Sequence, residues 1–407
     1  MSGPVLSLPT IQNWSCQNCS GCCRQHAIYI TPEEKQRIES QRWENSNEIP
    51  RGQLIFQTER PLGGPTRVRL AHQPDGACVF LDEQGLCRIH AKFGEDAKPL
   101  ACRIYPYAIH PAGDKLAVGL RFSCPSVARN QGRSVASQKK GLMEIARAVA
   151  PANYQTISAP ATTQKTVLSW KDTLRIADAL DQTLQPGDVP VSVKLARALF
   201  WMELVGQSHF EKIRGDQISE LLALLTGASA VEVPDRPDAA PPNKISQTQF
   251  RLLAGQYARK DTEATMDRSV SGRLRQLRVA WRLASGKGMA IPPQPELHEV
   301  SFEDLEQPLG GLDSQSEEML TRYYRVKIQS LHFFGAAYYS IPLVEGFQSL
   351  AATFPAILWI ARWHAVSHSR KSVTHDDVVW ALTVVDHQHG YSPIFGTWGF
   401  RRRIRNL

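Results

Sequence analysis

The chain has 407 residues, a length typical of two or three domains, or of one domain with a large extension. Its hydrophobic content of 42% and charged content of 21% are those of a globular protein with a buried core, which excludes disordered and fibrous classes. The net charge of +8 comes from basic residues spread along the chain, so we expect solvated basic faces and no nucleic-acid partner.

The chain shows no signal for export or for crossing a membrane. Its first residues lack the basic and apolar regions of a secretory signal, so we expect a cytoplasmic protein. The most apolar stretch, residues 331–363, is interrupted by Pro342, Glu345, Gln348 and Pro355 and is too short for a membrane span. We predict a buried helical pair there, and no membrane insertion.

All cysteines lie in the first third of the chain, and the remaining 283 residues contain none. Disulfides are one explanation, but thiols stay reduced in the cytosol, where clustered cysteines more often bind metal. We therefore predict that the metal ligands are drawn from Cys16, Cys19, Cys22, Cys23, Cys78, Cys87, Cys102 and Cys124.

The first cysteine group has the spacing C-x2-C-x2-C-C over residues 16–23, similar to the start of a ferredoxin ligand run. A C-x-x-C turn directs two thiolates at one metal, and Gly21 permits close approach of the backbone. Cys22 and Cys23 are adjacent, and we expect their side chains to point apart. This favours two metal sites, or one cluster with a supporting thiol.

The later cysteines lie in short irregular elements. Residues 79–81 suit a short strand, and a turn at 82–85 brings Cys87 back beside Cys78, as in a metal knuckle. His90 is either a ligand or a hydrogen-bonding neighbour. Pro99 suits the first position of a short helix that carries Cys102 in its first turn.

Two further features complete the cysteine-rich region. Arg103 either adds positive charge near the thiolates or forms a surface salt bridge. Residues 108–124 predict a hairpin that turns at 111–114 and returns Cys124 toward the site.

Together these residues resemble the YkgJ-type cysteine-cluster family, whose members carry a CxxCxxCC zinc- or iron-chelating domain. The resemblance rests on C-x-x-C-x-x-C-C at 16–23, Cys-x-Phe-Leu at 78–81, Gly-x-Cys-x-Ile-His at 85–90, Pro-x-x-Cys-Arg-x-Tyr-Pro at 99–106 and Cys124. The family's strand and helix start are matched at 28–34, where Thr31 suits an N-cap and Glu34 completes a capping box.

One branch of this family, the flagellin lysine N-methylases, also places a cysteine domain before a largely helical remainder. The resemblance therefore implies methyl transfer from S-adenosylmethionine to lysines of a protein substrate such as flagellin, associated with an iron–sulfur cluster. Residues beyond 130 add no motif of this activity. No catalytic residue and no residue that binds S-adenosylmethionine is predicted.

The rest of the chain predicts helices, with apolar residues spaced by three and four over 138–149, 173–184, 192–206 and 217–225. Residues 232–245 hold four prolines and form a linker or long surface loop. One or two arginine-rich helices follow over 247–285, with a solvated basic face of Arg268, Arg273, Arg275, Arg278 and Arg282.

Near the C-terminus, Thr374 suits a helix N-cap, and His387 and His389 suit that helix's C-terminal end. We expect the arginines at 401–403 and 405 to form a short frayed tail.

The predicted fold class is mainly α, with a small irregular α+β cysteine-rich metal domain followed by a helical body. The predicted domains are residues 1–130, a helical region 131–231, the linker 232–245 and a C-terminal helical region 246–407. The cofactor is a [4Fe–4S] cluster or zinc, with S-adenosylmethionine for the methylase.

Three functions stay open for this chain. The first is a cluster-dependent protein-lysine N-methyltransferase. The second is a non-catalytic scaffold or binding protein stabilised by zinc, and the third is an accessory protein for electron transfer or metal handling.

Overall fold

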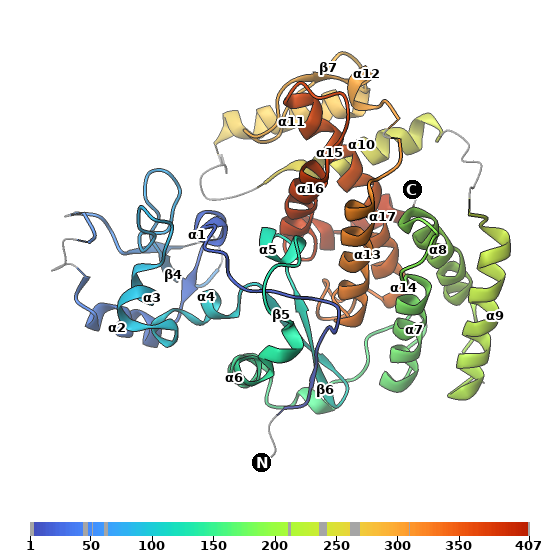
Figure 1. The fold of residues 1–407 in the computed structure, drawn as a ribbon, viewed down its shortest axis with the longest axis horizontal. Coiled ribbons are helices and arrows are strands. Elements are labelled where there is room, and N and C mark those ends of the chain that lie inside the picture. The colour runs from blue at the N-terminus through green and yellow to red at the C-terminus, as the bar shows by residue number, and fades with distance from the viewer. Residues whose placement is uncertain are drawn as a thin grey trace. The chain divides into compact units, whose positions relative to one another are not determined.

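The computed structural model describes residues 4–43, 48–50, 52–60, 64–210, 213–235, 242–260, 269–308 and 310–405. The chain divides into two compact units (Figure 1). The smaller, the cysteine unit, is formed by Ser15–Tyr107 together with Asp261–Arg268, and the larger, the helical unit, by Met1–Trp14, Ala108–Lys260 and Ser269–Leu407. Arg268 and residues 236–241 of the predicted linker lie outside the described residues. The domain boundaries at 130, 231 and 245 stay predictions.

The cysteine unit combines short helices with one small sheet, in which β2, β4 and β3 lie side by side in antiparallel order. Its elements are α1 Gly21–Gln25, β2 Tyr29–Ile30, α2 Pro32–Ser40, β3 Phe56–Glu59, β4 Arg67–Leu70, α3 Arg88–Phe93, a 3₁₀ turn Glu95–Ala97, and α4 Leu100–Ile104. The core beside the sheet includes Trp43 and Phe80, each 1% exposed, together with Cys78. Buried thiol and apolar core are therefore continuous in this unit.

The start of α2 confirms the predicted capping box. The Thr31 hydroxyl accepts a hydrogen bond from the Glu34 N–H at 3.2 Å, and the Glu34 carboxylate accepts one from the Thr31 N–H at 2.9 Å. Pro32 occupies the first helical position, where a backbone N–H would have no acceptor within the helix, so the lack of an N–H costs no hydrogen bond. Local sequence alone specifies this helix start.

The helical unit begins with a sheet that joins distant parts of the chain. Strand β1 Leu6–Ser7 pairs in parallel with β6 Lys115–Leu120, and β6 also pairs with β5 Tyr107–Ala112 in the order β1-β6-β5. The turn between β5 and β6 contains Gly113 at φ 73°, a left-handed conformation that glycine adopts readily. The predicted hairpin is therefore confirmed.

Helices make up most of the remainder, which confirms the mainly α fold class (Figure 1). They are α5 Pro125–Ala128, α6 Lys139–Val149, α7 Trp170–Thr183, α8 Val191–Gln207, α9 Asp216–Glu232, α10 Lys244–Ala258, α11 Val270–Ser285, α12 Phe302–Leu305, α13 Ser314–Gln329, α14 Leu343–Ala351, α15 Thr353–Ser367, α16 His375–Gln388 and α17 Trp398–Arg405. The small ribbon β7 Met289–Ala290 and β8 Val300–Ser301, and 3₁₀ turns Val135–Gln138, Tyr154–Thr156 and Pro393–Gly396, complete the unit.

The apolar segment near the C-terminus is the helical pair α14 and α15. Of the described residues, Leu343–Ser367 alone is long and apolar enough to cross a membrane by length and composition, with a mean hydropathy of 1.3. However, 72% of that window is buried within the protein. The burial agrees with the prediction of a buried helical pair.

The C-terminal arginines form part of a packed helix, so the prediction of a frayed tail was wrong. Arg401 on α17 binds both carboxylate oxygens of Glu345 on α14, at 2.6 and 2.8 Å. Arg403 donates to the side chain of Gln249 on α10 at 2.9 Å, and Phe400 and Ile404 are buried. The apolar residues at 400 and 404 share one helical face, which anchors the segment.

A buried ion pair links the last long helices to the sheet. Lys327 Nζ on α13 lies 2.6 Å from Asp386 Oδ1 on α16, and both side chains are at most 1% exposed. The other Asp386 oxygen accepts the backbone N–H of Ser123 at 2.9 Å. Removing one partner of such a pair leaves a buried charge without compensation, which is strongly destabilising.

Histidines surround this ion pair. Lys327 Nζ lies 3.5 Å from His332 Nδ1, and the His332 and His110 rings are 4.9 Å apart. Burial, with the nearby Lys327 charge, lowers the pKa of His110 to about 4 and lowers the pKa values of His332 and His389 as well. The folded helical unit therefore holds these rings neutral.

We expect the free energy of unfolding to decrease as the pH falls from about 6.5 to about 4. In this window the unfolded chain takes up protons that folded His110 does not bind, so stability is present above the window and lost through it. Linkage gives about 3 kcal/mol for His110 alone. Urea unfolding across this pH range tests it. His110→Gln should make the free energy of unfolding less dependent on pH, whereas His209→Gln, at an exposed histidine, should leave that dependence unchanged. The same pH dependence in both variants would show that His110 is not its source.

Candidate metal centre

The first cysteine group lies in a loop that leads into α1. Cys16 and Cys19 are exposed, whereas Cys22 and Cys23 sit in the helix and are partly buried. The Cys22 and Cys23 Sγ atoms, which we expected to point apart, lie 4.0 Å from each other. Two thiolates on one tetrahedral ion, with metal–sulfur bonds of about 2.3 Å, are separated by about 3.8 Å. Adjacent position in sequence therefore does not prevent the two sulfurs from meeting at one centre.

The second group consists of two consecutive turns of the same form, each ending in a cysteine. In the first turn, Gly76 N–H donates to Gln73 O at 2.9 Å and Gln73 N–H to Ala77 O at 2.7 Å, directly before Cys78. In the second turn, the equivalent bonds join Gly85 to Asp82 at 3.1 Å and Asp82 to Leu86 at 2.9 Å, directly before Cys87. We call these the first and second knuckles, residues 73–78 and 82–87. Sequence reasoning found only the second.

Glycine makes both knuckles possible, and one side chain joins them. Gly76 and Gly85 have φ of 82° and 77°, a conformation that other residues seldom adopt. The Gln73 amide donates to Cys78 O at 3.0 Å and to Leu81 O at 3.1 Å, so it bridges from the first knuckle to the start of the second. The shared spacing Gly-x-Cys was the signal that could have revealed the repeat.

The chain between the knuckles is a turn, and the predicted short strand at 79–81 was wrong. Leu81 N–H donates to Cys78 O at 2.9 Å, which closes the turn, and only Leu81 forms an isolated bridge to Cys87. The backbone N–H of Phe80 hydrogen-bonds to the Cys78 sulfur and lowers its pKa. Such an N–H···S contact is expected of a metal knuckle, because it stabilises the thiolate that a metal requires.

Cys102 lies in the first turn of α4, as predicted, although the helix begins at Leu100 and Pro99 is its N-cap. The Leu100 N–H, one of the free donors at this helix start, is bound by Glu34 Oε1 at 2.7 Å. The other oxygen of the same carboxylate closes the capping box of α2. Glu34, 9% exposed, therefore positions two helix starts at once, one of which carries a candidate ligand.

Four thiols, those of Cys22, Cys78, Cys87 and Cys102, act on one another electrostatically. Burial, together with the nearby Cys87 and Cys22 charges, raises the pKa of Cys78 to about 12. Burial also raises the pKa of Cys102, with contributions from the other three thiols. For Cys22, the hydrogen bond with the Cys23 side chain raises the pKa most, followed by burial.

Positive charge near these thiols comes from Lys98, which lowers the pKa of both Cys22 and Cys102. Sequence reasoning missed Lys98 and considered Arg103 instead. Arg103 pairs with Asp96 at 3.0 Å, and Asp96 is 93% exposed, so Arg103 forms the surface salt bridge that was the alternative. His90 is exposed on α3.

Cys124 belongs to the helical unit. It is buried, and it is the N-cap residue of α5, with Pro125 at the first helical position. Its predicted role as a metal ligand stays a prediction.

The donors fit a thiolate-bound metal. All eight cysteines are free thiols, and soft thiolate donors favour zinc and iron–sulfur centres over hard cations. Within the described residues, no group of three or more His, Cys, Asp or Glu side chains is arranged to hold a single metal ion. The four interacting thiols are thus gathered in one region without converging on one point.

A cavity of about 850 Å³ lies in the cysteine unit beside the knuckles. Its lining includes Gln73 of the first knuckle, Asp82 of the second, and the charged side chains of Arg24, Arg88 and Lys92. This volume is within the range of small-molecule sites. The cavity places a polar binding space next to the turns that carry Cys78 and Cys87.

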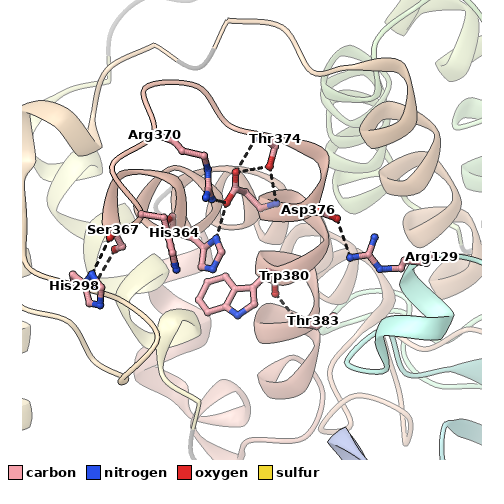
Figure 2. Close-up of polar contacts among 11 residues, drawn as sticks. Arg129, His298, His364, Ser367, Arg370, Thr374, Asp376, Trp380 and Thr383 are labelled. Atoms are coloured by element: carbon pink, nitrogen blue, oxygen red, sulfur yellow. Dashed lines mark hydrogen bonds and ion pairs between the residues drawn. The ribbon is translucent and has the colours of Figure 1, made fainter. Parts of the chain in front are cut away.

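The helical unit contains a separate polar cluster between α15 and α16 (Figure 2). His364 Nδ1 lies 2.6 Å from the buried carboxylate of Asp377, which also binds Arg370 and accepts the Thr374 N–H at 2.8 Å. The His364 ring stacks on Trp380 at 4.2 Å. Thr374 is the N-cap of α16, as predicted, and it forms a capping box with Asp377, so the cluster joins two helices.

The knuckles, the buried thiols and the all-sulfur donor set define a cysteine-rich metal-chelating domain. Residues 15–125 match the family model CxxCxxCC, described as "Putative zinc- or iron-chelating domain", which confirms the resemblance seen in the sequence. No curated protein and no solved structure matches the chain.

Glu34→Ala should lower the stability of the cysteine unit by about 1–2 kcal/mol, because it removes a helix cap and a second buried acceptor. Urea unfolding of the full chain, followed by a probe in the cysteine unit, measures the change. Glu39→Ala is the matched control on the same helix, since Glu39 forms only an exposed pair with Lys35. Equal effects of the two substitutions would show that Glu34 does not position α4.

Proposed function

We propose that the cysteine unit binds an iron–sulfur cluster through Cys22, Cys78, Cys87 and Cys102. The observation that carries this proposal is that α1 and the two knuckles meet at one core: the Cys78 N–H donates to Cys23 O at 2.8 Å, and Cys23 and Cys87 pack against the core that contains Cys78. Cys102 on α4 is close enough for the charges of Cys78, Cys87 and Cys22 to raise its pKa. The raised pKa values keep these thiols protonated in the metal-free chain, and a bound cation or cluster would stabilise them as thiolates. Zinc or iron chelation is also what the matched family description names.

The all-thiolate donor set suits an iron–sulfur cluster, whose irons are held by cysteine thiolates. A structural zinc site with four cysteine ligands is the alternative. The all-thiolate donor set also argues against hydrolysis at zinc, which uses histidine or carboxylate ligands and an open position.

The remaining predicted ligands have different surroundings. Cys23 touches Cys22 and packs against the unit's core, so we assign it a supporting role beside the centre. Cys16 and Cys19 are exposed in the preceding loop. This contrast between exposed and buried thiols gives a matched pair of variants.

Cys78→Ser should reduce bound iron by at least about tenfold, since loss of even an outer partner of a metal ligand costs about 10–100-fold in affinity. Protein purified without oxygen is assayed for iron, zinc and sulfide and for broad visible absorption. Cys16→Ser, at an exposed thiol, should retain most of the metal. Equal loss in both variants would refute the four-ligand assignment. A colourless protein with stoichiometric zinc would refute the cluster and favour the zinc-stabilised scaffold.

A more specific function, methylation of protein lysines, follows from the family branch that the chain resembles. This function requires that only three of the four thiols bind the cluster, so that one iron is left free for the amino and carboxylate groups of S-adenosylmethionine. The cavity beside the knuckles supports this hypothesis, because its polar and charged lining suits a polar cofactor or a polypeptide. The chain's own contribution would be to bind and orient these molecules next to Cys78 and Cys87.

We expect cluster-loaded protein to transfer a labelled methyl group from S-adenosylmethionine to flagellin, and Cys78→Ser to abolish transfer. Arg88→Gln, on the cavity lining, should weaken binding of S-adenosylmethionine while leaving the iron content unchanged. Loaded protein that neither binds S-adenosylmethionine nor transfers the label would refute methylation and leave the electron-transfer or metal-handling role.

A further inference from the structure

Helix α11 exposes a row of large apolar side chains to solvent. Val270, Leu274, Leu277 and Trp281 are 74%, 61%, 66% and 66% exposed. Their spacing of i, i+4, i+7 and i+11 places them on one face along almost the whole helix. We call this face the α11 ridge. The sequence predicts a solvated basic face on this helix, but the exposed surface of α11 is partly apolar as well as basic.

The opposite face of α11 packs normally, so the ridge is not a sign of a misplaced helix. Gly272, Val279 and Leu283 are buried, and α11 lies along α10 (Figure 1). Leu283 fits so closely against Gly255 of α10 that a Cβ there would meet its Cδ1 at 2.2 Å. Both helix ends are also well specified, with Ser269 as N-cap and Gly286 as a left-handed C-cap.

Arginines flank the ridge on both sides. α11 contains four arginines and no acidic residue. At 3.6 residues per turn, Arg273 falls on one side of the ridge and Arg278 on the other, with Arg275 and Arg282 beyond Arg278. Arg273, Arg275 and Arg278 form no ion pair with any residue that the structure describes.

The pattern of charge determines which partner fits. A second copy of the chain would bring two arginine-rich ridges together, and the like charges would repel. Exposed apolar side chains between unpaired cations instead fit a partner with an apolar interior beneath an anionic outer layer. An anionic phospholipid bilayer has that structure, and arginine stems can extend along apolar surface while their charged ends reach phosphate. Tryptophan is also favoured at the membrane interface.

We propose that the α11 ridge docks the protein peripherally on an anionic phospholipid membrane. Leu274, Leu277 and Trp281 enter the interfacial region, and the four arginines bind lipid phosphates around them. No helix crosses the bilayer in this arrangement, because α11 stays attached to α10 along its buried face. The proposal does not depend on the metal centre or on methyl transfer.

The test uses the full-length protein and sedimentation with vesicles of phosphatidylcholine, with or without phosphatidylglycerol. We expect binding only to the anionic vesicles, and weaker binding at higher salt. The triple variant Leu274→Ser/Leu277→Ser/Trp281→Ser should lose at least about tenfold in binding. Arg278→Gln should lose about fivefold, the effect of one basic residue near an anionic surface.

The matched control is Leu224→Ser/Val231→Ser on α9, where the side chains are 72% and 80% exposed but no arginine lies on the helix. It should bind vesicles like the unchanged protein. Circular dichroism checks that all variants fold. Binding that is equal on neutral vesicles, that survives the triple variant, or that is absent at low salt overturns the proposal. Ridge-dependent capture of an acidic protein without vesicle binding also overturns it and assigns the ridge to protein recognition.

Discussion

Repulsion among the thiolates is the constraint that the cysteine unit is built to satisfy. Cys22, Cys78, Cys87 and Cys102 come from separate segments, yet Cys22 and Cys87 raise the pKa values of both Cys78 and Cys102. The apolar core around Cys78 increases this cost of ionisation, because burial disfavours any unpaired charge. The Phe80 N–H, the Cys23 backbone and Lys98 offset it within the described chain. A unit with this composition would gain stability from the proposed positively charged centre, because metal binding to thiolates is coupled to folding.

The connectivity of the chain explains why the cysteine unit is held at both ends. Strand β1 pairs with β6 more than 100 residues later in the same helical unit, so residues 15–107 enter and leave as an insertion. Cys124 then lies beyond the point of return, at the start of α5. The matched family region, residues 15–125, therefore covers the Ser15–Tyr107 part of the cysteine unit and the β5–β6 hairpin of the helical unit. The family description therefore says nothing of the function of the helical unit beyond residue 125.

The local features of this protein could be predicted from its sequence, and the long-range ones could not. The capping boxes at Thr31 and Thr374 depend on residues three apart, and the predicted helices and hairpin depend on nearest-neighbour patterns. By contrast, the hydrogen bond from the Leu100 N–H to Glu34 joins residues 66 positions apart. The first knuckle was missed because its cysteine was considered without its glycine. The approach of Cys22 to Cys23 depends on side-chain conformations that spacing does not specify.

Two parts of the helical unit depart from ordinary packing, and they do so in opposite ways. Lys327 and Asp386 form a charged pair in the interior, where apolar residues of similar volume are often at least as stable. The α11 ridge places apolar side chains outside, where polar ones would be more soluble. Neither departure involves the proposed metal centre, whose four assigned thiols lie in the other unit. Of the two, the ridge alone faces solvent in the described structure, which is why the membrane proposal is built on it.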